Sequence, residues 1–258
     1  MRQLGQQSKT SCAGEPVLEV LALSFNYPDR PHVLQGVSLR VWAGERVGVI
    51  GPNGAGKTTL FLLICGVLRP ASGKIYLFGR PVVPGEFLPE VGMVFQTPED
   101  QIFCPAVKED VAFGPRNLGL SKEEVEARVQ EAFAITGIAE LANRPPHHLS
   151  GGEKRLVAIA GVLAMRPRLV LYDEPTSNLD HRYRRRLINF LEAARETMLI
   201  ASHDLEFILE VCNRVVLIDG GRIVANGNPR EVMGDGALMD AHGLERPHSL
   251  IPHADPHH

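Results

Sequence analysis

Apolar residues gather along the chain in short runs that end at glycine, proline or aspartate, as strands do. The run RLVLYDEP (168–175) is apolar without alternation, which predicts a parallel strand buried on both faces. Further along, TMLIASH (197–203) predicts another strand and RVVLIDGGRIVANG (214–227) a strand pair. Earlier strands are expected at VLEVLALSFNY (17–27), VLQGVSLRV (33–41), RVGVIG (46–51), GKIYLFG (73–79) and VGMVFQ (91–96).

Helical spacing of apolar residues separates these strands. The segment SKEEVEARVQEAF (121–133) opens with Ser121 and Glu124 at the spacing of a capping box, before apolar residues at helical intervals. Strands that alternate with helices indicate an α/β protein with a mostly parallel core sheet. A helical pattern between the strands near 91–96 and 168–175 indicates a helical insertion at about 97–164. Other helices are expected over Lys57–Val67, about 181–196 and about 205–213.

We divide the chain into three parts. Residues 1–16 are polar and lack the apolar core of a secretory signal, so we interpret them as a flexible leader. Residues 17–232 carry the strands and helices and predict one α/β domain. Residues 233–258 are predicted to be a histidine-rich C-terminal tail, since residues 242–258 hold five of the ten histidines.

Composition agrees with an ordinary soluble globular protein, with 44% apolar and 22% charged residues over 258 positions. The net charge of −3 gives no reason to expect nucleic acid as a partner. The longest apolar run, LFLLICGVL (60–68), is about half of the ~20 residues that a membrane-spanning helix needs, so it predicts a buried helix. Scattered cysteines without metal or redox spacing predict reduced thiols in the cytoplasm: Cys12, Cys65, Cys104 and Cys212.

A glycine-rich segment follows the third expected strand. GPNGAGKT (51–58) matches G-x-x-x-x-G-K-[ST] and lies between a strand and a helix, the context in which this pattern binds phosphates. Backbone N–H groups and the helix N-terminus attract phosphate oxygens. Lys57 is expected to reach the β- and γ-phosphates of ATP, and Thr58 to bind Mg²⁺. The predicted ATP-binding residues here are Gly51, Pro52, Asn53, Gly54, Ala55, Gly56, Lys57, Thr58 and Thr59.

Two acidic residues end the apolar strand at 168–175. Asp173 is expected to help hold the Mg²⁺ shell. Glu174 comes next and points elsewhere, which suits a base or an orienting group for the attacking water. Acid pairs are common at strand ends, but the phosphate-loop pattern upstream favours the catalytic interpretation.

A second glycine pair lies in LSGGEKR (149–155). Ser150 and Glu153 have capping-box spacing, and Gly151 and Gly152 leave the first amides of the helix uncovered. The segment is either a well-capped helix or a second anion site that uses the same amides. Two phosphate-binding elements in one chain indicate a site completed by two subunits.

These motifs, in this order, resemble the ATP-binding subunit of ABC transporters over about residues 17–232. The resemblance implies a P-loop NTPase fold with an antiparallel β subdomain and an inserted helical subdomain. It also implies ATP and Mg²⁺ as cofactors and a nucleotide-sandwich dimer with a second copy of the chain. LSGGEKR resembles the family signature, with Glu153 where glutamine is commoner; either side chain can close the capping box.

The resemblance further assigns roles to single residues. His203, in ASHD, matches the switch histidine that senses the γ-phosphate, and Gln96 matches the glutamine that links Mg²⁺ and water to the membrane subunits. Asp180, in SNLD (177–180), matches the residue of the loop that crosses the dimer interface. Tyr27 stands where the family stacks an aromatic ring on adenine, although a lone aromatic near a strand end also fits core or surface packing.

The segment VFQTPEDQIFCPAVKEDVAFGP (94–115) begins like a buried strand and then breaks. In the family, this region meets a helix of the transmembrane partner, and its wording here resembles energy-coupling-factor importers, including cobalt and nickel uptake ATPases. The implied partners are a transmembrane coupling subunit and a substrate-binding membrane subunit, at the cytoplasmic face of the membrane. The alternative is an irregular surface loop without a partner. Asp100 and Gln101 follow a proline and are predicted to be exposed.

The last residues offer possible metal ligands. Neutral imidazoles and a carboxylate suit Ni²⁺, Co²⁺ or Zn²⁺, which favours a metal over a vitamin as the cargo. A polar tail that binds metal only incidentally is the alternative. Because an ATPase need not touch the cargo, a vitamin importer is also possible. A soluble ABC-type ATPase of DNA repair or translation is a poorer fit, because this chain has one domain and no sustained heptads. The candidate ligands are His253, Asp255, His257 and His258.

Overall fold

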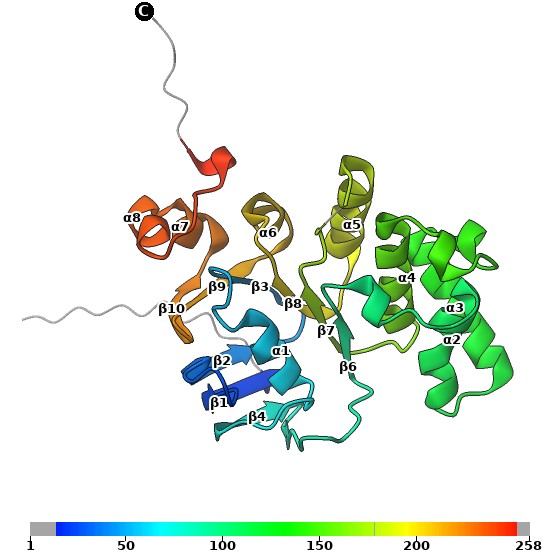
Figure 1. Cartoon of the computed structure of the whole chain (residues 1–258), viewed down its shortest axis with the longest axis horizontal. Coiled ribbons are helices and arrows are strands. Elements are labelled where there is room, and N and C mark those ends of the chain that lie inside the picture. The colour runs from blue at the N-terminus through cyan, green and yellow to red at the C-terminus, as the bar shows by residue number, and fades with distance from the viewer. Residues whose placement is uncertain (1–13, 178, 252–258) are drawn as a thin grey trace, which may run out of the picture.

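A six-stranded sheet forms the centre of the computed structural model, which describes residues 14–177 and 179–251 (Figure 1). Its strands follow the order β10-β9-β3-β8-β7-β6, and all neighbours are parallel except the β9–β10 pair. This agrees with the predicted mostly parallel core sheet. The strands are β3 (Arg46–Ile50), β6 (Val91–Val94), β7 (Leu169–Asp173), β8 (Thr197–Ala201), β9 (Arg214–Asp219) and β10 (Arg222–Gly227).

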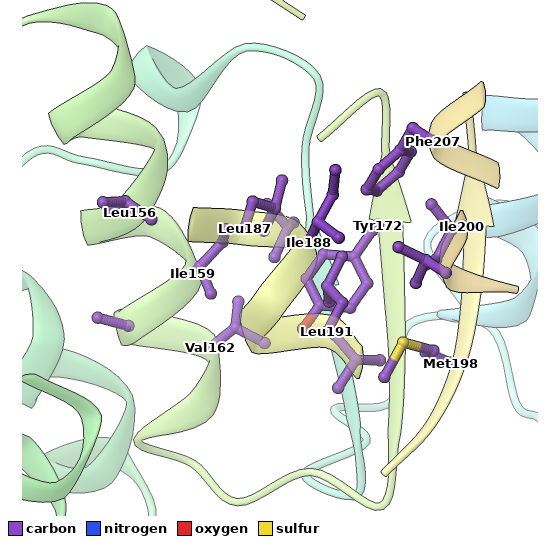
Figure 2. Packing of buried hydrophobic residues seen from close by; sticks show 14 of the residues in the cluster. Leu156, Ile159, Val162, Tyr172, Leu187, Ile188, Leu191, Met198, Ile200 and Phe207 are labelled. Atoms are coloured by element: carbon purple, nitrogen blue, oxygen red, sulfur yellow. The ribbon is translucent and has the colours of Figure 1, made fainter. Parts of the chain in front are cut away.

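The central strands are apolar because both of their faces are covered. All residues of β7 and β8 are buried. Alternate side chains enter different cores: Leu169 and Leu171 pack on one side of the sheet, whereas Val170 and Tyr172 pack on the other. Figure 2 shows Tyr172 among the apolar side chains of α5 (His181–Ala193). The continuous apolar runs in the sequence therefore reflect burial on two faces.

An antiparallel sheet and α1 (Lys57–Ile64) cover one face of the central sheet. α1 ends three residues before the predicted Val67, because the backbone turns at Cys65 and Gly66, which has φ of 71°. The antiparallel sheet has the order β2-β1-β4-β5, and its presence confirms the expected β subdomain. Its strands are β1 (Leu18–Phe25), β2 (Leu34–Val41), β4 (Ser72–Leu77) and β5 (Arg80–Pro81).

Three helices between β6 and β7 form a helical subdomain beside the sheet (Figure 1). They occupy the predicted insertion and pack on one another through a shared apolar core. The hydroxyl of Ser121 caps its helix by accepting from the Glu124 amide, but the Glu124 carboxylate pairs with Arg128, so the predicted capping box is only half formed. The helices are α2 (Val107–Asn117), α3 (Lys122–Thr136) and α4 (Gly151–Leu163); short 3-10 turns lie at Pro98–Asp100, Ala139–Leu141 and Pro146–His148.

Helices after β10 extend the folded part beyond the predicted domain end. The predicted boundary at 232/233 falls inside α7 (Pro229–Gly234), because Met233 is fully buried in the core below it. Met239 of α8 (Gly236–Ala241) is also fully buried, and a 3-10 turn at His248–Leu250 follows. The first part of the predicted tail is therefore folded onto the domain. The remaining helices are α5 and α6 (Leu205–Val211), on the face opposite α1.

Within the described residues, none of the helices combines the length and apolar character needed to cross a bilayer. The four candidate metal ligands of the tail lie outside the described residues, as does Cys12.

Candidate active site

The glycine-rich loop turns sharply between β3 and α1. Gly51 has φ of 150°, and a Cβ there would lie 2.0 Å from the Ile218 carbonyl oxygen. Gly56 has φ of 102° and immediately precedes α1, where a Cβ would meet Leu34 and Val33. Both positions thus require glycine for the close approach of neighbouring groups. The loop leaves the N-terminus of α1 facing the space in which an anion can bind.

The ammonium group of Lys57 lies against this loop. Its Nζ donates to the Gly51 carbonyl at 2.8 Å and to the Pro52 carbonyl at 3.1 Å, and lies 3.4 Å from Nε2 of His203. The residue is 7% exposed, and burial lowers the pKa of its ammonium group. A buried cation held by neutral carbonyls is suited to binding an anionic ligand, which would replace the lost solvation.

Asp173 and Glu174 face the same space from the end of β7. Glu174 has φ of 47°, a left-handed backbone conformation that is uncommon outside glycine. Its Oε2 accepts from the His203 amide at 3.2 Å and from the Ser202 hydroxyl at 3.4 Å. Oε1 lies 3.3 Å from the His203 ring, yet it is buried without a hydrogen bond. Burial raises the pKa values of both carboxyl groups, as expected for charges that lack full compensation.

These groups line one pocket of about 520 Å³. It is bounded by the loop before α1, the end of β7 and the segment before α6, so separate parts of the sequence meet at the carboxyl end of the sheet. Tyr27 lies at its edge, with its hydroxyl 3.4 Å from Oγ1 of Thr59 and its ring packed edge-on against Phe25. The predicted residues that line the pocket are Tyr27, Asn53, Gly54, Ala55, Gly56, Lys57, Thr58, Thr59, Gln96, Asp173, Glu174 and His203.

The LSGG segment lies elsewhere in the chain's fold. The Ser150 hydroxyl accepts from the Glu153 amide at 3.3 Å, and the Glu153 carboxylate accepts from the Ser150 amide at 2.8 Å, so the predicted capping box is present. Asp180 caps α5 by accepting from the Tyr183 amide at 2.9 Å. None of these residues, nor Gly151 and Gly152, lines the pocket around Lys57. One chain therefore does not bring the glycine-rich loop and the LSGG segment onto one ligand.

Comparison with known proteins agrees with this geometry. The ABC transporter family model matches residues 34–177. The chain belongs to the ABC transporter family. An ABC transporter ATP-binding protein from Synechocystis sp. is 55% identical, over 91% of this chain and 83% of the relative. The energy-coupling factor transporter ATP-binding protein EcfA of Methanothermobacter thermautotrophicus is 46% identical, over 90% of this chain and 77% of the relative.

A solved structure is also similar to this chain over most of its length. The structure of cbiO1 from Clostridium perfringens, described as part of the ABC transporter complex cbiONQ, has a TM-score of 0.78 at 35% identity and covers 88% of this chain and 94% of that one. The protein is therefore an ATPase that hydrolyses ATP to drive transport, of the EcfA and CbiO kind. Its P-loop fold with a β subdomain and a helical subdomain is confirmed.

Several residues of this ABC ATPase line the pocket without having been predicted. Arg30, on the turn that starts at Tyr27, donates to the Gly54 carbonyl at 2.8 Å. Asp204 follows His203 and caps α6 by accepting from the Phe207 amide. The signal available in the sequence was their nearness to predicted residues. Val33, Thr176 and Ser177 also line the pocket.

The loop after β6 departs from one expectation. Gln101, predicted to be exposed, is only partly so, because its side-chain amide bridges the loop: Oε1 accepts from the Phe95 amide and Nε2 donates to the Met93 carbonyl, both at 2.8 Å. It is therefore a structural residue of the loop, whereas Asp100 is exposed as predicted. The buried guanidinium of Arg155, on α4, donates to the carbonyls of Phe95 and Gln96 at 2.5 Å each. This clamp had no signal in the sequence beyond the arginine of LSGGEKR.

Proposed function

We propose that this ATPase works as a homodimer on the cytoplasmic face of the membrane and powers an energy-coupling-factor importer for cobalt or nickel ions. The observation that carries the ATPase part is the pocket that gathers Lys57, Asp173, Glu174 and His203 around one space. The importer part rests on similarity to EcfA and to cbiO1.

The donor set of the pocket fits Mg²⁺. Asp173 supplies a carboxylate, and Thr58 and Gln96 line the same space with a hydroxyl and an amide. Carboxylate, hydroxyl and amide oxygens are the donors that this hard cation prefers. When bound with ATP, Mg²⁺ would neutralise charge on the phosphates. These three residues are the proposed Mg²⁺ ligands.

The protein's own groups divide the remaining work of hydrolysis. The loop amides and Lys57 bind phosphate oxygens, and Glu174, held by Ser202 and the His203 amide, orients the attacking water and accepts its proton. The high pKa of a buried carboxyl group makes Glu174 a stronger base than an exposed glutamate. His203 lies within 3.4 Å of Lys57 and 3.3 Å of Glu174, a position suited to contact with the terminal phosphate.

Separation of the two phosphate-binding elements supports the dimer. The N-terminus of α4, at Ser150 and Gly151, is exposed, so its backbone amides could bind an anion from solvent or from a second subunit. It does not line the pocket of its own chain. In a two-fold dimer the same two patches meet twice, so each ATP would lie between the loop of one subunit and the LSGG segment of the other. ATP binding would close this dimer, and hydrolysis would open it.

An apolar groove supports contact with a membrane subunit. It has a volume of about 420 Å³ and lies between the loop after β6, α2 and α4. Phe103 and Phe113 form an edge-on pair at its rim and are 64% and 45% exposed; Phe87 is 67% exposed. Three exposed aromatic rings around one groove indicate a protein-binding surface. The groove contains part of the segment 94–115, so nucleotide-dependent motion of Gln96 would reach the bound partner.

The proposed cargo is a transition-metal ion. The histidines of the tail favour Co²⁺ or Ni²⁺, while a vitamin importer is the second candidate because the ATPase need not touch its cargo. The described residues contain no cluster of three or more histidine, cysteine, aspartate or glutamate side chains arranged to hold a metal ion. The proposed ligands for a transition metal, which lie in the tail outside the described residues, are His253, Asp255, His257 and His258.

Co-purification tests the proposal most directly. The protein is expressed with a C-terminally intact chain in its native host, isolated with bound membrane proteins, and reconstituted in vesicles. ATP-dependent uptake of Co²⁺ or Ni²⁺, abolished by Glu174→Gln, is expected. Vesicles that take up a vitamin and neither metal would establish the second candidate, and a preparation without any membrane partner would contradict the importer.

A further inference from the structure

The first turns of α5 carry a run of large side chains, HRYRRR (181–186), that no nucleotide motif uses. The ring of Tyr183 packs over Gly152 of the LSGG segment: a Cβ added to Gly152 would lie 2.7 Å from Cδ2 of Tyr183. α5 and the start of α4 therefore touch directly. A change in the position of the LSGG segment has to displace this ring or move with it.

The next residue of α5 reaches the other functional segment. Arg184 donates through Nε to Oδ2 of Asp204 at 2.7 Å and through a terminal nitrogen to Oδ1 at 3.2 Å. Such a two-point contact fixes direction as well as distance. Both side chains are half-buried, at 23% and 29% exposed. Asp204 directly follows His203, so Arg184 anchors the side chain of the residue next to the switch histidine.

Further contacts make the helix a rigid link. Asp180 caps its N-terminus, and Arg186 donates to the carbonyl of Gly137, at the end of α3 in the helical subdomain. Consecutive residues of a helix point in directions about 100° apart, which is why Tyr183 and Arg184 can serve different neighbours. Because the helix backbone between them is fixed, the two contacts move together.

We propose that Tyr183 and Arg184 are positioning residues that couple the His203 segment of one ATP site to the LSGG segment that serves the other site. The inference rests on the proposed homodimer. In that dimer, the His203 segment and the LSGG segment of one chain belong to different ATP sites, so a contact that joins them within the chain joins the two sites. Loss of γ-phosphate at one site would thereby change the affinity of the second site for ATP.

Cooperativity of ATP hydrolysis is the readout that separates this role from a merely structural one. The isolated full-length protein is assayed over a range of MgATP concentrations as wild type, Tyr183→Ala, Arg184→Ala and Tyr183→Phe. The matched control is Arg185→Ala, which removes a neighbouring arginine of the same helix that is 58% exposed and pairs with Glu210. Thermal unfolding of each variant reports on folding, and ATP-dependent dimer formation by Glu174→Gln is measured in parallel.

For the wild type, a Hill coefficient above 1 and at most about 2, the number of sites, is expected. Tyr183→Ala and Arg184→Ala should reduce it to about 1, the value of independent sites, while Tyr183→Phe and Arg185→Ala keep the wild-type value. A wild-type coefficient retained by both alanine variants would overturn the inference, even if their rates or melting temperatures fall. A wild-type coefficient of about 1 would also overturn it. Whether Glu174→Gln forms a dimer with ATP tests the proposed homodimer separately from the coupling.

Discussion

Three ionisable side chains in the pocket are almost fully buried, although burial disfavours the charged form of each. Lys57, Asp173 and Glu174 are each at most 7% exposed and lie around one pocket with His203. Burial shifts each pKa toward the neutral form, lowering it for Lys57 and His203 and raising it for the two acids. The free protein thus keeps costly charges in place for a ligand that carries charges of its own.

Glu174→Gln is expected to retain ATP binding and to lose nearly all turnover. Glutamine keeps the size of the side chain but cannot accept a proton from water, while the phosphate contacts of Lys57 and the loop are untouched. General-base contributions of this kind are typically about 10²–10⁴-fold. Single-turnover hydrolysis measured with saturating MgATP tests the expectation. A rate within a factor of about 3 of the wild type would show that Glu174 has no such role.

The same substitution should stabilise the ligand-free protein in a pH-dependent manner. Because burial raises the pKa of Glu174 above 4.5, the folded state holds the proton more tightly than the unfolded chain. Stability of the wild type therefore falls as pH rises from 4.5 through the raised pKa, and glutamine removes this loss. At neutral pH the melting temperature should rise by about 2–4 °C for each 1 kcal/mol gained.

Melting curves of both proteins across pH test this expectation. The difference between them should vanish well below pH 4.5, where the carboxyl group of the wild type is protonated in the folded and the unfolded state. Glu192→Gln, at an exposed position of α5, serves as the control and should change little at any pH. A melting temperature of Glu174→Gln below that of the wild type at neutral pH would contradict the expected direction of the change.

At the scale of elements, the groove between the loop after β6, α2 and α4 shares no lining residue with the ATP pocket. A substitution in the groove should therefore affect binding of the proposed partner without affecting hydrolysis. Phe103→Ala removes an exposed ring whose loss should alter folding stability by no more than about 0.5–1 kcal/mol. Basal ATPase activity of the isolated protein should stay at the wild-type rate, whereas uptake by the assembled importer should fall by at least about tenfold, as for the loss of an anchor at a protein interface.

Ile135→Ala is the matched control for this experiment. Ile135 lies on α3, is 46% exposed and does not line the groove. Its truncation should leave both activities unchanged. Equal uptake by Phe103→Ala and Ile135→Ala would show that the ring at position 103 does not bind the membrane subunit. Gln101 is unsuitable for such a test, because its amide holds the loop together.

The elements themselves could be predicted well from the sequence, for a physical reason. Strands such as β7 and β8 are buried on both faces and had to be largely apolar, so their signal was strong. The capping box of α4 is local and could be recognised from Ser150 and Glu153. Helix ends were less accurate: α1 stops at Ile64, since turning at Gly66 depends on packing that the helical pattern does not encode.

At the scale of the whole molecule, two inactive variants should restore activity when mixed. Lys57→Ala removes the phosphate contact of one patch, and Ser150→Arg blocks the other patch, which does not line the pocket of its own chain. A heterodimer has one site with both defects and one with neither, so mixing equal amounts should recover up to about a quarter of the wild-type activity per dimer, half of the dimers being mixed.

The recovery is measured as ATPase rate after mixing, with heterodimer formation followed by two affinity tags. Each variant mixed with itself provides the control. Inactive mixtures in which heterodimers are shown to form would contradict a composite site that works with one intact half.

At this scale, side-chain contacts between residues distant in the sequence could not be predicted. The P-loop, Asp173 and His203 could be joined into one site because parallel strands end at the same edge of a sheet. Nothing local marked Arg155, Tyr183 or Arg184, whose partners are distant in sequence. The end of the domain was misplaced for a related reason, since Met233 and Met239 are buried by tertiary contacts of short helices with weak patterns.

The clamp of Arg155 has a mechanical consequence. The residue is 2% exposed, its guanidinium bonds two successive carbonyls of the loop at Gln96, and its Nε has no hydrogen bond. Breaking those bonds would strand a buried charge, at a cost of about 3–5 kcal/mol. The loop and α4 are thus stiff with respect to each other. A force on the aromatic groove, which is lined by Phe95 of the loop and Val157 and Ala158 of α4, would therefore move the Gln96 backbone and α4 together rather than one past the other.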